Sequence, residues 1–120
     1  MRRLRHRLAD DRGAGSVLAL AVIGAVVALV VGIVPVLAIL VDTQRAANAA
    51  DAAALAAADA TSGAVATSGS ACELAGRVAR RGGAEVVSCE IDGLEASVAV
   101  RLTAALFPVT ARARAGPPPP

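Results

Sequence analysis

Residues 13–41 read GAGSVLALAVIGAVVALVVGIVPVLAILV, and none of these 29 side chains is charged. A helix needs about 20 apolar residues to cross a hydrocarbon core of about 30 Å. A secretory signal peptide has an apolar region of only about 7–15 residues. A helix buried in a soluble domain would need more apolar partners than the remaining sequence supplies. The run therefore predicts one transmembrane helix over residues 13–41.

The charges on either side of this run set an expected orientation. Residues 1–12 hold five arginines and two aspartates, whereas residues 42–120 hold seven arginines and eight acids. Positively charged flanks stay on the cytoplasmic side of a membrane. We therefore expect a single-pass protein of the cell membrane, with a cytoplasmic basic tail over 1–12 and an extracytoplasmic C-terminal part.

The run continues into VDTQRAANAADAAALAAADA, residues 41–60. Alanine is the strongest helix former, so residues 42–61 should extend the membrane helix as an Ala-rich segment. At 100° per residue, Arg45, Asn48, Asp51 and Asp59 fall on one arc. Either the opposite arc packs against another helix, or the segment is a stalk without a partner. This helix-packing face consists of Ala46, Ala47, Ala50, Ala53, Ala54, Ala57 and Ala58.

An Arg-rich start, one apolar helix and the Asp42–Ala60 pattern together resemble the N-terminal module of TadE/TadG-like proteins of Flp, or tight-adherence, pilus assembly. The carriers of the resemblance are Asp42, Arg45, Asn48, Asp51 and Leu55 among their alanines. The short length and the later cysteines are similar to small actinobacterial TadE-like proteins encoded near secretion genes. The resemblance implies a minor pilin-like or pseudopilin-like subunit that works in assembly beside other pilin-like or Tad proteins.

Pilins are usually cut after a glycine that a glutamate follows a few residues later. Gly13 and Gly15 are the candidate processing sites here, but the first acid after them is Asp42. The sequence therefore leaves both a trimmed and an untrimmed N-terminus open.

Residues 62–71 are rich in Gly, Ser and Thr and are typical of a linker. Ser70 and Glu73 form a capping-box pattern at the start of a short helix. Asp92-Gly93 between two apolar alternations predicts a β-hairpin. A two-residue Asp92-Gly93 turn would pair Ile91 with Leu94, Cys89 with Ala96 and Val87 with Val98, and would set Glu90 opposite Glu95. We expect a small extracytoplasmic helix–hairpin domain over 72–107 and an extended Pro-rich tail over 108–120.

The two cysteines, Cys72 and Cys89, fall on the expected helix and on the first strand. A structural disulfide between them suits an oxidising compartment. A metal site would need more ligands, and a redox pair would favour the C-x-x-C spacing. Closing a loop of this size contributes about 3 kcal/mol to stability.

The sequence offers no catalytic constellation that we recognise, because its one histidine, His6, lies on the other side of the expected membrane helix. We therefore expect an α+β, membrane-anchored, non-enzymatic protein without cofactor, metal, nucleic-acid partner or small-molecule substrate. The favoured function is a component of a Tad/Flp-type assembly or secretion system that acts by helix packing. The alternative is a membrane-tethered binding module for an extracellular ligand or the cell wall.

Overall fold

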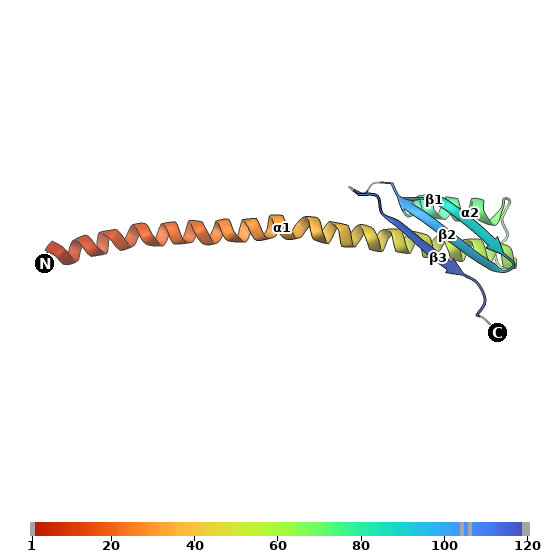
Figure 1. The fold of residues 1–120 in the computed structure, drawn as a ribbon, viewed down its shortest axis with the longest axis horizontal. Coiled ribbons are helices and arrows are strands. Elements are labelled where there is room, and N and C mark those ends of the chain that lie inside the picture. Colours follow the sequence, from red (N-terminus) through yellow and green to blue (C-terminus); the bar gives the residue numbers. More distant parts are fainter. Residues whose placement is uncertain (1, 104, 106, 119–120) are drawn as a thin grey trace. The chain divides into compact units, whose positions relative to one another are not determined.

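The computed structural model describes the backbone of residues 2–103, 105 and 107–118, with side chains described from residue 13 onward. The element order is α1 (Arg2–Ser62), α2 (Ala71–Arg81), β1 (Ala84–Asp92), β2 (Glu95–Leu102) and β3 (Thr110–Ala115) (Figure 1). The chain divides into two compact units, Met1–Ala38 and Ile39–Pro120. The α+β class expected from the sequence is confirmed.

Helix α1 is continuous from Arg2 to Ser62 and contains Pro35. It therefore includes the expected basic tail, the apolar run and the Ala-rich segment in one element. Its end at Ser62 lies one residue beyond the expected boundary. The side chains of the N-terminal arginines and of His6 lie outside the described residues.

Helix α2 begins at the capping box expected from the sequence. The backbone N–H of Glu73 donates to Ser70 Oγ at 3.2 Å, and the backbone N–H of Ser70 donates to Glu73 Oε2 at 2.7 Å. The helix stops at Gly82, and Gly83 follows with a φ of +76°. Glycine suits that left-handed conformation because it has no Cβ.

The three strands form an antiparallel sheet in the order β1-β2-β3. Strand β3 occupies residues for which an extended tail was expected, so that expectation is wrong for residues 110–115. Its alternating burial shows why it is a strand: Ala113 is buried, whereas Arg112 and Arg114 are exposed. The stretch TARARA alternates alanine and arginine with the period of a strand, and the proline run that follows it is typical of an extended tail.

The hairpin exists, but its expected register is wrong. Asp92 pairs with Glu95, Ile91 with Ala96 and Cys89 with Val98, so the turn is Gly93-Leu94. Gly93 has a φ of +59°, which the first central position of a type II′ turn requires. Glu90 faces Ser97 in this register, and the acid opposite Glu95 is Asp92 instead. Arg114 of β3 forms an ion pair with Glu95 on its other side.

The register of β1 shifts a second time at a bulge between Val86 and Ser88. The extra residue is Val87, whose side chain is 49% exposed. Val87 was expected on the apolar face opposite Val98. The turn register sets Cys89 opposite Val98, and the bulge leaves Val87 without a partner on β2.

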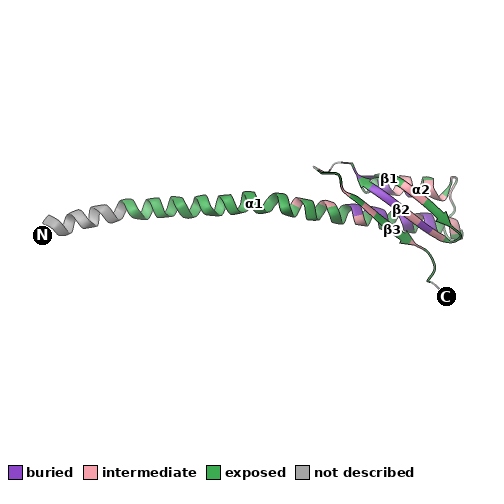
Figure 2. Cartoon of the chain, viewed as in Figure 1, coloured by how far each residue is buried: buried purple, intermediate pink, exposed green. Residues whose placement is uncertain are grey.

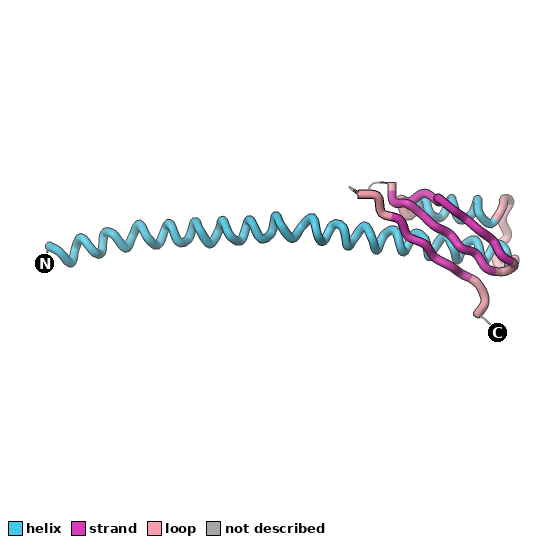
Figure 3. Tube along the Cα trace, in the orientation of Figure 1, coloured by secondary structure: helices cyan, strands magenta, loops and turns pink. Residues whose placement is uncertain are grey.

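One core holds the second unit together. Every second residue of β2 faces it, from Ala96 through Val98 and Val100 to Leu102. Figure 2 shows buried residues on β2 and on the distal part of α1, and Figure 3 shows α2 and that part of α1 on the same side of the sheet. The core is built mainly from alanine, with Val98 and Val100 as its largest fully buried side chains.

Candidate interaction site on the anchor helix

The alanine face of α1 is a buried surface. Ala46, Ala50, Ala53 and Ala57 are 0% exposed, and Ala54 is 1% exposed. Ala58 is also buried, and Ala47 is half-buried. The helical-wheel argument missed Ala49, which is 4% exposed and belongs to the same face.

The residues that cover this face belong to the same chain. The α1 alanines share one core with Ala75 and Ala79 of α2 and with Val98 and Val100 of β2. The sequence left two alternatives open, packing against another helix or a stalk without a partner. The structure covers the face with a helix of the same chain, α2, and with the sheet, although the sequence predicts a linker between α1 and that domain.

Small side chains are what this packing requires. A Cβ added to Gly82 would lie 3.1 Å from the Cβ of Ala49 and 3.3 Å from the carbonyl oxygen of Ala79. The end of α2 therefore approaches α1 so closely that a side chain at position 82 would require its neighbours to shift by a few tenths of an ångström. Alanine on α1 and glycine at the end of α2 allow this approach.

The opposite arc of α1 faces solvent, as the wheel predicts. Arg45, Asn48, Asp51 and Asp59 are exposed, and Leu55 on the same arc is 57% exposed. Arg45 Nη1 lies 4.0 Å from Asp42 Oδ1, one helical turn away. This pair adds little stability, because the Arg45 side chain is 67% exposed and solvent screens it.

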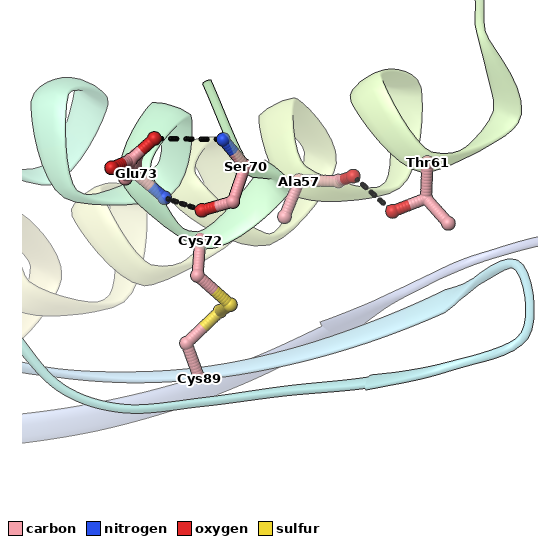
Figure 4. Close-up of a disulfide and its surroundings, with 6 residues drawn as sticks. All are labelled: Ala57, Thr61, Ser70, Cys72, Glu73 and Cys89. Atoms are coloured by element: carbon pink, nitrogen blue, oxygen red, sulfur yellow. Dashed lines mark hydrogen bonds between the residues drawn. A yellow bond between two sulfur atoms is a disulfide. The ribbon is translucent and has the colours of Figure 1, made fainter.

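The disulfide between Cys72 and Cys89 is confirmed, and its Cα atoms are 5.9 Å apart. Figure 4 shows it joining the first turn of α2 to β1 beside the Ser70–Glu73 capping box. It closes the connection between two elements that both pack on the alanine face. The bond thereby holds α2 and β1 together over the alanine face. It also points to an oxidising compartment.

The apolar run of α1 has the opposite character. Its large apolar side chains from Val17 to Val41 are 46% to 71% exposed. Among the described residues, one helix is long and apolar enough to cross a membrane, and its span Gly13–Ser62 lies near the N-terminus with a mean hydropathy of 3.1 in its most apolar window. A helix that is apolar on all sides must meet an apolar environment, either lipid or other helices.

Gly13 and Gly15 lie inside α1 and are exposed, and a Cβ at either would meet open space. The hydroxyl of Ser16 donates to the carbonyl oxygen of Gly13 at 3.0 Å. Neither glycine is needed to fit against a neighbouring atom of the described chain. Whether a peptidase cuts there stays a prediction.

Shallow grooves lie where the chain leaves β3. One of about 460 Å³ is lined by Glu95, Arg114 and residues 115–118. Another of about 240 Å³ lies among Leu55, Asp59, Leu94 and Pro117, with further lining from Ala58, Ser62 and Gly116. Arg114 and Glu95 form an ion pair across neighbouring strands. Sequence reasoning missed these grooves, because it did not bring residues 114–117 beside α1.

Within the part of the chain that the structure describes, no three His, Cys, Asp or Glu side chains gather into a metal site. The grooves offer one ion pair and apolar or backbone groups, which gives us no reaction to derive. The expectations that the chain is not an enzyme and takes no cofactor remain predictions.

Comparison with protein families, with curated proteins and with solved structures finds no match for this chain. The structure by itself gives a pilin-like architecture. It combines a long apolar N-terminal helix with a small disulfide-bonded β domain.

Proposed function

We propose that the chain is a non-enzymatic, minor pilin-like or pseudopilin-like component of a Tad/Flp-type pilus assembly or secretion system. It is anchored by α1 in the cell membrane with its N-terminus in the cytoplasm and its domain outside. Its partners are the membrane and other pilin-like or Tad assembly proteins. It acts by lateral packing of the apolar run and carries out no chemistry.

The observation that carries this proposal is the contrast in exposure along α1. The alanine face is already occupied by the chain's own domain, whereas the apolar side chains from Val17 to Val41 remain exposed. A surface for neighbouring subunits is therefore available on the apolar run. The motif over residues 42–60, which resembles the TadE/TadG-like module, supports the assignment to this class of machine.

Two observations support the proposed orientation of the chain in the membrane. The arginines of residues 1–12 favour a cytoplasmic N-terminus by the positive-inside rule. The Cys72–Cys89 disulfide favours an oxidising compartment for the domain. Both point to the same arrangement, with the domain outside.

A helix exchange tests whether α1 packs or merely anchors. In a cell that carries this gene, its deletion should reduce surface pili or secreted protein, and a wild-type copy should restore them. A copy with residues 13–41 replaced by an unrelated Leu/Ala spanning helix should remain inserted but fail to restore them. Full restoration by the exchanged chain would instead favour the tethered binding module, for which any anchor suffices.

Intact mass of the membrane-extracted protein tests processing separately. Loss of the residues up to Gly13 or Gly15 would place the chain among processed pilin-like subunits. A full-length mass would make it an uncut anchor with the same packing role.

A further inference from the structure

Phe107 is the only aromatic residue of the chain, and its side chain is 62% exposed. It lies in the connection between β2 and β3, next to the exposed Pro108. The core of the second unit is short of large side chains, with Val98 and Val100 as its largest fully buried ones. An aromatic ring would add more buried area than any of them. Its exposure therefore indicates a use outside the core.

The connection that carries Phe107 leaves the sheet at a fixed point. The backbone N–H and the hydroxyl of Thr103 both donate to the carbonyl oxygen of Gly83, at 3.1 and 2.8 Å. The backbone N–H of Leu102 donates to the carbonyl oxygen of Val109 at 2.9 Å. These bonds close the base of the connection beside the end of α2.

Within the unit Ile39–Pro120, this base lies at the end where α1 enters the domain. Gly82, next to Gly83, is packed against Ala49 of α1. At the opposite end of the sheet, Leu94 of the β1–β2 turn and Ser62 at the end of α1 line the same groove. Figure 1 shows the β2–β3 connection and the β1–β2 turn at these two opposite ends.

The apolar run ends close to where the domain begins to cover α1. Val41 is 49% exposed, whereas the Asp42 side chain is 21% exposed and Ala46 is 0% exposed. Five helical residues from Val41 to Ala46 rise about 7–8 Å. The headgroup region adds about 5–8 Å on each side of the hydrocarbon core. A helix inserted up to Val41 therefore brings this end of the domain to the membrane surface.

The charge of the domain differs between its two ends. Asp92 and Glu95 flank the turn end, and Asp59 lies in the groove beside Leu94. Arg114 lies at the same end, where it is ion-paired with Glu95. Exposed arginines gather on the segments that meet at the other end, where Asp42 and Glu85 are the acids. These arginines are Arg45, Arg80, Arg81 and Arg101.

We propose that this end of the domain rests on the membrane leaflet from which α1 emerges, with Phe107 inserted at the headgroup level and the arginines facing anionic lipids. The apolar face of an interfacial helix, with its Trp, Phe and Leu side chains, lies about 5–10 Å into this boundary. Each arginine near an anionic surface adds to the attraction. The inference rests on the proposed membrane anchoring of α1, and it adds a second contact that fixes how the domain stands on the bilayer.

Tryptophan substitution tests the contact, because the chain has no tryptophan and each variant carries a single reporter. The full chain is reconstituted in phosphatidylcholine vesicles with phosphatidylglycerol. A fraction of the lipid is brominated in the upper acyl chain in one preparation, which reports on residues 94 and 107, and near the chain end in a second, which reports on residue 29. Phe107→Trp should be quenched several-fold more strongly than Leu94→Trp and should emit at shorter wavelength. Leu94 is the matched control, since its side chain is 52% exposed at the turn end.

Leu29→Trp reports on α1 itself. Quenching of Leu29→Trp without stronger quenching of Phe107→Trp over Leu94→Trp overturns this inference and leaves the membrane anchor standing. Absence of quenching in Leu29→Trp overturns the anchor and this inference together. Quenching of Phe107→Trp should fall when phosphatidylglycerol is omitted, and an unchanged value would overturn the role of the arginines.

Discussion

The two parts of α1 are both apolar and both helical, yet they meet opposite environments. From Val17 to Val41 the large side chains are 46% or more exposed, whereas from Ala46 to Ala57 the alanine face is nearly inaccessible. The difference lies in side-chain size and in distribution around the helix. Large apolar residues on all sides suit lipid or neighbouring helices, whereas a one-sided stripe of methyl groups suits close contact with a folded domain.

This contrast shows that an Ala-rich extension of a long apolar helix can form one side of a domain core. Alanine buries little area per residue, so such a core has a small hydrophobic contribution from each contact. The Cys72–Cys89 disulfide compensates by restricting the unfolded chain. The following predictions act on one side of the contrast at a time.

The largest effect is expected from a charge placed in the alanine face. Ala53→Asp should destabilise the domain by at least about 3 kcal/mol, because it buries a carboxylate without a partner. Ala52→Asp is the matched control, since Ala52 is exposed on the same helix. Hydrogen exchange of the β2 amides, measured on the full chain in detergent, reports the loss. Equal exchange in the two variants would contradict the burial of the face.

A charge placed in the apolar run should act on insertion and leave the domain intact. Leu29→Arg should make the free energy of membrane insertion less favourable by about 3–4 kcal/mol, from the difference between leucine and arginine at a helix centre. Leu55→Arg, on the exposed arc of the Ala-rich part, should insert like the wild type. Insertion efficiency in a translocation assay measures both variants. A similar loss in Leu29→Arg and Leu55→Arg would contradict the distinction between the apolar run and the Ala-rich part of α1.

Removal of the disulfide should weaken the packing of α2 and β1 against the alanine face. The double variant Cys72→Ala and Cys89→Ala should lose about 3 kcal/mol of domain stability. Denaturant midpoints of the wild type with and without reductant supply the comparison. Reductant should shift the wild type to the midpoint of the double variant and leave the variant unmoved. An unchanged midpoint in the reduced wild type would show that alanine packing alone holds the domain.

The smallest effect is expected at the capping box. Ser70→Ala removes the acceptor for the Glu73 backbone N–H and should cost about 1 kcal/mol. Ser68→Ala, in the exposed linker, provides the control, and thermal unfolding of the domain is the readout. A cost at Ser68 as large as that at Ser70 would assign the effect to the linker and not to the cap.

Much of the fold could be predicted because the deciding signals are local. The uncharged run, the alanine periodicity, the Ser70–Glu73 cap and the two cysteines each lie within a short window. The hairpin register could not be predicted, because it depends on where Gly93 sits in the turn and on the bulge at Val87. Strand β3 was hidden because its pairing with β2 is a tertiary contact and prolines follow it.

For the candidate site, the sequence predicts the face itself but not what covers it. A helical wheel finds the alanine face and its polar opposite, since both depend only on the period of 3.6 residues. The identity of its partner depends on how the chain folds back after Gly63, and a flexible Gly/Ser/Thr composition carries no information on that. The close approach at Gly82 became visible only once Ala49 lay beside it.

Methyl nuclear Overhauser effects test the central claim most directly. The chain is labelled at Ala, Val and Leu methyl groups, diluted into unlabelled chain and placed in lipid nanodiscs. The account predicts intramolecular contacts from methyl groups of the alanine face to Val98 or Val100, and lipid contacts from Leu29. Alanine-face methyl groups that contact only other chains, or only water, would contradict it.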